Sequence, residues 1–153
     1  MKNKIDSYNQ LKESFTAVCD KETPWEVGLV SLLALIKEKN PLVSWVGVYL
    51  WKKDRLWIGP YQGKLACLYI FKGKGVCGKS YEEQKTICVE NVNEFEGHIA
   101  CDPESQSEIV LPLFKNNQCV GVLDLDSKKL SAFDKIDAQA LKEILLKLNE
   151  CTV

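Results

Sequence analysis

Three of the seven cysteines in this chain lie beside glycines in segments that read as loops or loop edges, namely Cys67, Cys77 and Cys101. A cysteine in a protein core is usually apolar filler, whereas a thiol in a loop is accessible for reaction. The separations of 10 residues (77 − 67) and 24 residues (101 − 77) match neither zinc-finger nor C-x-x-C spacing. Three interpretations stay open: catalytic or redox thiols, inert thiols, and a zinc site with His98 as the fourth ligand.

The surroundings of two of these thiols favour chemistry. Cys77 lies between Gly75 and Gly78, where a turn is expected to enter a helix, and a helix N-terminus lowers a thiol pKa by stabilising the thiolate. Cys101 lies in the polar segment 91–106, a long loop of the kind that carries function. His98 in that loop is either a general base or thiolate partner, or a plain hydrogen-bonding residue. The other four cysteines are interpreted as structural filler: Cys19, Cys88, Cys119 and Cys151.

Carboxylates form a second candidate group. Asp124 and Asp126 are two residues apart on an expected strand, so their side chains project from the same face, and Glu108 begins the partner strand of the hairpin. Carboxylates that share a face repel, raise one another's pKa and favour a shared proton. Such a group can act as an acid or hold a substrate ammonium, and a solvated face without function is the alternative.

Two aromatic residues share a face of the first long strand. Trp45 and Tyr49 are four residues apart, and the strand period is two. They are candidates for the wall of an apolar pocket that accepts a methyl or thioether group, and ordinary core packing is the alternative.

The elements that position these residues are read from hydrophobic periodicity. Helices are expected over about 5–39, interrupted near residue 20, and again over about 134–148. Strands are expected at 43–51, 56–58, 64–71, 86–89, 108–114 and 118–125, with a short helix at 79–84. Helices at both ends of a run of strands predict one α+β domain, 1–153, whose sheet and active-site loops span about 42–127.

Composition excludes several classes of function. The net charge of −1 and the pI of 5.9 do not indicate the excess of positive charge that is typical of nucleic-acid-binding proteins. No apolar stretch of signal-peptide length follows the N-terminus, and the longest apolar run, 27–36, is far shorter than the roughly 20 residues that span a bilayer. We therefore expect a cytoplasmic protein without membrane contact.

The cysteines, carboxylates and glycines fall into five ordered motifs, at residues 59–67 (GPYQGKLAC), 73–78 (GKGVCG), 97–102 (GHIACD), 107–112 (SEIVLP) and 121–127 (GVLDLDS). Together they resemble the free methionine-(R)-sulfoxide reductases, which are single-domain enzymes of the GAF fold. The resemblance covers about residues 45–133. It implies a six-stranded antiparallel sheet with helices packed against it, and reduction of free L-methionine-(R)-sulfoxide to L-methionine.

The resemblance also implies roles for the candidate residues. Cys101 matches the cysteine that attacks the sulfoxide sulfur, Cys67 the principal resolving cysteine, and Cys77 a third that enters alternative disulfides. The family's substrate-site carboxylates and aromatic wall match Glu108, Asp124, Asp126, Trp45 and Tyr49. The implied cycle uses no bound cofactor, passes through a sulfenic acid and a disulfide, and depends on an external dithiol such as thioredoxin.

The resemblance further implies a possible homodimer. Two rivals are kept: a non-catalytic GAF module that binds a small ligand, and a thiol- or metal-based redox sensor.

Overall fold

The fold is built around one antiparallel sheet of six strands in the order β3-β2-β1-β6-β5-β4. The computed structural model describes residues 3–152. Its helices are α1 (Lys4–Val18), α2 (Trp25–Lys39), α3 (Gly75–Glu83), the 3-10 turn η1 (Val92–Glu94) and α4 (Lys135–Cys151). Its strands are β1 (Trp45–Lys52), β2 (Arg55–Gln62), β3 (Tyr69–Ile70), β4 (Ile87–Val89), β5 (Ser107–Lys115) and β6 (Gln118–Ser127).

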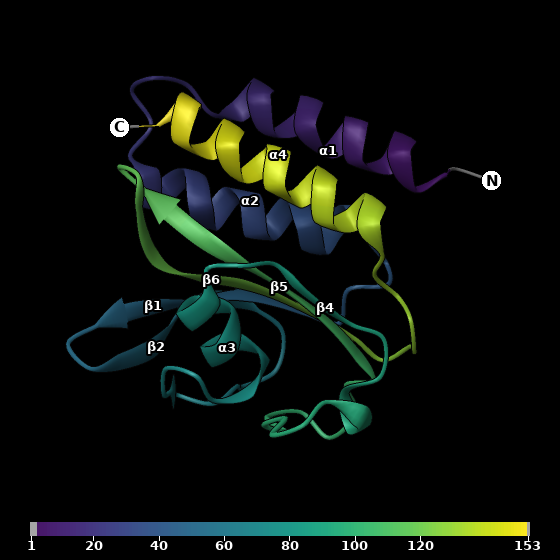
Figure 1. Cartoon of the computed structure of the whole chain (residues 1–153). Coiled ribbons are helices and arrows are strands. Elements are labelled where there is room, and N and C mark those ends of the chain that lie inside the picture. Colours follow the sequence, from purple (N-terminus) through teal and green to yellow (C-terminus); the bar gives the residue numbers. More distant parts are fainter. Residues whose placement is uncertain (1–2, 153) are drawn as a thin grey trace.

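The sheet separates two layers. Helices α1, α2 and α4 cover one face, and α3 lies on the other face with the loops that precede and follow it (Figure 1). The predicted α+β architecture with a six-stranded antiparallel sheet is confirmed. Within residues 3–152, no helix has both the length and the apolar character that crossing a membrane requires.

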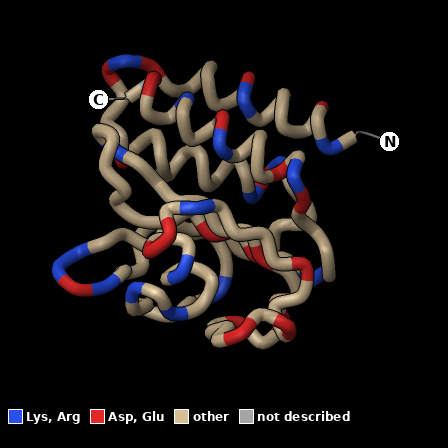
Figure 2. The backbone as a smooth tube through the Cα atoms, in the orientation of Figure 1, with Lys and Arg blue, Asp and Glu red and all other residues tan. Residues whose placement is uncertain are grey.

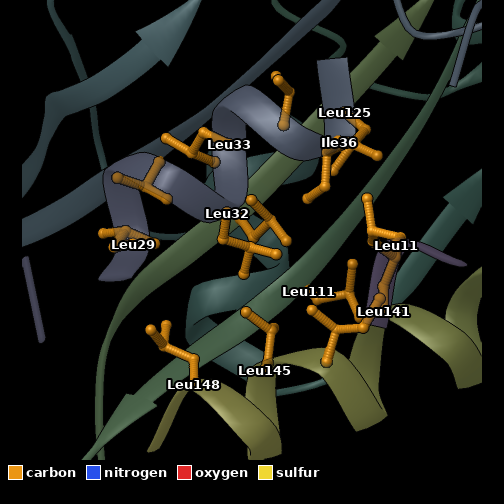
Figure 3. Close-up of a cluster of buried hydrophobic side chains, with 14 of the residues drawn as sticks. Leu11, Leu29, Leu32, Leu33, Ile36, Leu111, Leu125, Leu141, Leu145 and Leu148 are labelled. Atoms are coloured by element: carbon orange, nitrogen blue, oxygen red, sulfur yellow. The ribbon is translucent and has the colours of Figure 1, made fainter. Parts of the chain in front are cut away.

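The helix-covered face holds the larger core. Strand residues such as Val46, Leu111 and Leu125 are fully buried against leucines of α2 and α4 (Figure 3). Burying one leucine side chain stabilises a fold by about 1.5–3 kcal/mol, so this layer supplies much of the stability. Because side chains alternate along a strand, the neighbouring residues Trp45, Tyr49 and Asp124 point to the opposite face.

A buried polar contact ties the N-terminal helix to the C-terminal one. Asp137 is fully buried and accepts hydrogen bonds from Lys4 Nζ at 2.6 Å and from Tyr8 Oη at 2.6 Å. The same aspartate completes a capping box with Asp134 at the start of α4. Burial and the Asp137 charge raise the pKa of Tyr8, so its hydroxyl stays a proton donor.

Two expectations about local structure are wrong. The strand expected at 64–71 is limited to Tyr69–Ile70, and the residues before it form a loop. The short helix begins at Gly75, four residues earlier than expected, because Gly75 adopts a φ of 61° that lets the chain turn directly into α3. Both differences bear on the cysteines, since Cys67 lies in the loop and Cys77 in the helix.

Candidate active site

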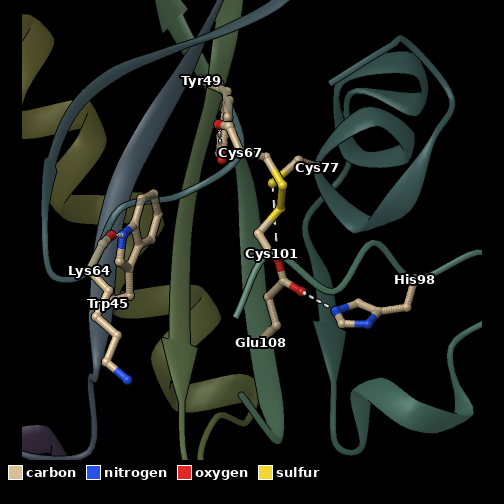
Figure 4. The surroundings of a disulfide bond; sticks show 8 residues. All are labelled: Trp45, Tyr49, Lys64, Cys67, Cys77, His98, Cys101 and Glu108. Atoms are coloured by element: carbon tan, nitrogen blue, oxygen red, sulfur yellow. Dashed lines mark hydrogen bonds and ion pairs between the residues drawn. A yellow bond between two sulfur atoms is a disulfide. The ribbon is translucent and has the colours of Figure 1, made fainter. Parts of the chain in front are cut away.

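A disulfide joins two loops on the face of the sheet that carries α3. Cys67 lies between β2 and β3, Cys101 lies between η1 and β5, and their Cα atoms are 5.5 Å apart (Figure 4). The bond links residues separated by 34 positions in the chain. Two of the three predicted thiols are therefore brought into direct contact.

Two aromatic side chains of β1 hold the backbone of the Cys67 loop. Trp45 Nε1 donates to the carbonyl oxygen of Lys64 at 3.0 Å, and Tyr49 Oη donates to that of Cys67 at 2.9 Å. The two rings stack with centroids 6.3 Å apart, and both residues line the pocket beneath the disulfide. Both are also buried, so Trp45 and Tyr49 serve as pocket wall and as core at once.

The three carboxylates meet in this pocket as the strand alternation predicts. Glu108 of β5 pairs directly with Asp126 of β6, which pairs with Trp45 of β1, so these three side chains form one row across the sheet. Asp124 lies one row further along β6, on the same face. Burial raises the pKa of Asp126 well above its usual range, and the Glu108 charge adds to this.

Asp124 is the least satisfied group in the pocket. Burial raises the pKa of Asp124 well above its usual range, and the charges of Asp126 and Glu108 raise it further. Its Oδ1 atom is buried and has no hydrogen-bond partner among the residues that the structure describes. Leaving a buried acceptor unpaired costs about 1–3 kcal/mol, and more for a charged one. A cationic ligand group would remove that cost.

The prediction of an activated thiolate at Cys77 is wrong. Cys77 lies in the first turn of α3, but it is buried against the carboxylates, with its Sγ 3.9 Å from Glu108 Oε1. Burial raises the pKa of the Cys77 thiol well above its usual range, and the charges of Asp124 and Glu108 add to this. Desolvation and negative neighbours outweigh the helix terminus, because a thiolate here would be a further buried anion.

The alternative zinc site, which the cysteine spacing does not favour, is not assembled in the disulfide form. Cys67 and Cys101 are consumed in the disulfide, and His98 instead faces Glu108, with Nε2 3.6 Å from Oε2 (Figure 4). A different trio has the spacing to hold an ion, since ligand atoms of Cys77, Glu108 and Asp124 lie within 4.8 Å of one another. All three of these residues are buried in the same pocket.

The cysteines that were interpreted as structural filler differ in the exposure of their side chains. Cys19 is buried at the end of α1, as expected, and Cys119 is partly exposed in β6. Cys88 is exposed, which contradicts the prediction, because β4 is an edge strand; its Sγ contacts the carbonyl oxygen of Phe133. The side chain of Cys151 lies outside the part of the chain that the structure describes.

Sequence reasoning missed two polar contacts of the pocket. Ser105 Oγ donates to Asp126 Oδ1 at 3.1 Å. Lys64 Nζ binds Glu104 Oε2 at 2.6 Å, which connects the two disulfide-bearing loops a second time, and Lys128 also contacts this carboxylate. The two lysines lower the pKa of Glu104 to about 2. Ser105 and Glu104 lie in the loop already singled out, but only the folded chain reveals their partners.

Comparison with known proteins identifies the family. The GAF domain family matches residues 23–149. The chain is 41% identical over 148 residues to the free methionine-R-sulfoxide reductase of Escherichia coli, covering 97% of this chain and 90% of that protein. It is 42% identical over 144 residues to GAF domain-containing protein A of Dictyostelium discoideum, covering 94% and 90%.

A solved structure extends the likeness to three dimensions. The free methionine-R-sulfoxide reductase of Neisseria meningitidis, determined in complex with its substrate, superimposes with a TM-score of 0.92 at 39% identity, covering 98% of this chain and 90% of that one. The fold, the length and the sequence therefore agree, and the chain belongs to the free methionine-R-sulfoxide reductases of the GAF domain family.

Proposed function

We propose that this chain reduces free L-methionine-(R)-sulfoxide to L-methionine with its own cysteines. The observation that carries the proposal is the Cys67–Cys101 disulfide over a pocket that holds three carboxylates. A thiol pair supplies the two electrons, and a carboxylic acid supplies the proton that a sulfoxide oxygen needs before it can leave. The Neisseria meningitidis relative was solved with its substrate bound, which supports the choice of substrate.

The substrate fits the pocket by charge and by shape. The unpartnered oxygen of Asp124 would accept a hydrogen bond from the amino acid's ammonium group. Trp45 and Tyr49 would pack against the methyl end of the thioether side chain. This arrangement leaves the sulfoxide sulfur near Cys101, which also lines the pocket.

The first chemical step is proton-assisted attack on sulfur. Glu108 and Asp126 are the proposed donors, because burial raises the pKa of Asp126 and favours its protonated form, and Glu108 lies directly opposite it on the neighbouring strand. The Cys101 thiolate attacks the sulfur of the protonated sulfoxide. The hydroxyl group then passes from that sulfur to Cys101 Sγ, so methionine leaves with the electron pair and Cys101 becomes a sulfenic acid.

The second step forms the disulfide. The Cys67 thiol condenses with the sulfenic acid and releases water, so one sulfoxide and two thiols give methionine, water and one disulfide. Cys77 lines the same pocket as Cys101 and could take part in exchange, but its raised pKa makes it the slower resolving thiol. An external dithiol of the thioredoxin type then restores the two thiols, and no bound cofactor is needed.

The protein is proposed to work in the cytoplasm, where reducing conditions keep thiols such as Cys77 and Cys119 from oxidising. A homodimer is proposed from the family resemblance, and sedimentation analysis measures it.

A single assay tests the proposed activity. With dithiothreitol as reductant, the protein should consume free L-methionine-(R)-sulfoxide but neither the S epimer nor peptide-bound sulfoxide. Cys101→Ser should abolish turnover, whereas Cys119→Ser, a matched change in a strand thiol outside the pocket, should retain it. An active Cys101→Ser protein would overturn the assignment of the nucleophile. An inactive wild-type protein would favour the rival GAF module that only binds a ligand.

A further inference from the structure

The disulfide lies among exposed apolar side chains. Leu65 is 78% exposed and Leu68 is 60% exposed, and they lie two residues before and one residue after Cys67. Ile99, two residues before Cys101, is 38% exposed. We call Leu65, Leu68 and Ile99 the apolar rim. Large apolar side chains that gather at a reactive bond are typical of a surface that contacts another protein.

Cys67 and Cys101 differ in their position relative to the substrate pocket. Cys101 lines the substrate pocket together with Leu65 and Ile99, whereas Cys67 and Leu68 do not line it. Both cysteines are partly exposed, and Tyr49 donates a hydrogen bond to the carbonyl oxygen of Cys67. The difference between them is that Cys101 faces the substrate pocket and Cys67 lies outside its lining.

The charges around the disulfide are also unequal. Residues 63–81, which include Cys67, carry four lysines and no acidic residue. Residues 86–107, which include Cys101, carry five acidic residues and neither lysine nor arginine. Figure 2 shows the lysines along the chain around α3 and the acidic residues on the long loop after β4. The segment that bears Cys67 is thus richer in lysine than the segment that bears Cys101.

We propose that the apolar rim, with Leu68 at its outer side, docks a dithiol protein of the thioredoxin class and directs its thiolate to Cys67 Sγ rather than to Cys101 Sγ. This inference rests on the proposed function, which requires the disulfide to be reduced after every turnover. We assign a dithiol protein to this surface because the disulfide lies within the apolar rim. Reducing the disulfide takes two electrons, which another molecule must supply.

The electron balance explains why attack on Cys67 is productive. The partner's thiolate forms a bond to Cys67 Sγ, the Cys67–Cys101 bond breaks, and the electron pair leaves with Cys101 Sγ. Cys101 is thereby released as a thiolate inside the pocket, where the next sulfoxide binds. The partner's second thiolate then attacks the mixed disulfide, so Cys67 leaves as a thiolate and the partner becomes the disulfide.

The first experiment compares a protein reductant with a small one. Leu68→Glu should lower kcat/KM for thioredoxin roughly 5-fold or more, the effect expected for an interface anchor, and leave kcat/KM with dithiothreitol within about 2-fold. Leu146→Glu is the matched control, since Leu146 on α4 is 56% exposed and distant in sequence from both loops. Equal behaviour of the two variants with thioredoxin would overturn the docking surface.

The second experiment identifies the attacked sulfur. Thioredoxin whose second active-site cysteine is replaced by serine is mixed with the oxidised protein, and the trapped adduct is digested and mapped by mass spectrometry. The expected adduct is on the peptide containing Cys67, and an adduct on the Cys101 peptide would refute the proposal. This trapping needs no sulfoxide, so its result is separate from the activity assay in which the proposed function itself can fail.

Discussion

Replacing Asp124 by asparagine should make the ligand-free protein more stable and should lower its catalytic efficiency. Asp124 is buried, its Oδ1 atom is unpartnered, and burial with two neighbouring carboxylates raises its pKa. Asparagine has nearly the same shape and carries no charge, and its amide can donate to Glu108. Removing a buried, unpartnered carboxyl group whose ionisation the fold opposes should therefore stabilise the protein by about 1–3 kcal/mol near pH 8.

The stability difference between Asp124→Asn and the wild type should change with pH in a definite direction. Below about pH 4, the aspartate is protonated in the folded and unfolded states, so the variant and the wild type should be equally stable. As pH rises, the unfolded chain loses the proton while burial and the neighbouring carboxylates keep it on the folded protein, so the wild type loses stability until the raised pKa of Asp124 is reached. The advantage of asparagine therefore grows between pH 4 and pH 8.

Thermal unfolding at several pH values measures the effect. For a chain of this length, 1 kcal/mol corresponds to about 2–4 °C in Tm, so an increase of about 2–12 °C is expected at pH 8. Glu13→Gln, an exposed carboxylate on α1, should change Tm little at any pH. The kcat/KM for free sulfoxide should fall at least about 30-fold, because the substrate ammonium loses a buried charge partner. A gain in Tm that is equal at pH 4 and pH 8, or a loss at pH 8, would refute the reasoning.

Two further substitutions test contacts that the structure shows. Tyr49→Phe removes the hydrogen bond to the Cys67 carbonyl, so chemical denaturation should reveal a loss of about 1 kcal/mol, and stopped-flow measurements should show slower disulfide formation. Lys4→Met leaves the buried Asp137 with Tyr8 as a remaining side-chain donor, which should cost about 3 kcal/mol. Unchanged stability in Lys4→Met would mean that Asp137 does not need the ammonium group.

The sequence predicted the parts of the site that depend on strand alternation. Asp124 and Asp126 share a face because they are two residues apart, and Trp45 with Tyr49 does so for the same reason. Strand alternation is local, so a single sequence contains these features. The pairing of Glu108 with Asp126 also depends on a register shift between Leu113 and Phe114, since the turn alone would set Glu108 opposite Leu125.

The predictions that were wrong concern features that depend on contacts between residues far apart in the chain. The strand expected before Tyr69 is a loop, and Trp45 and Tyr49 bind two of its carbonyl groups from β1. The pKa of Cys77 rises because the fold buries its thiol beside carboxylates of β5 and β6, and its position at a helix start does not reveal this. Cys88 is exposed because β4 is the last strand of the sheet, which only the strand order determines.

The Cys67–Cys101 disulfide links oxidation to folding. A bridge between residues 34 positions apart restricts the unfolded chain and stabilises the native state by about 3–4 kcal/mol. By thermodynamic linkage, the native fold must favour the disulfide by the same free energy, which corresponds to about 60–90 mV in reduction potential. The reduced protein, which holds the attacking thiol, is then the less heat-resistant form. The relative amplitudes of the two melting transitions should therefore report what fraction of the molecules still await reduction.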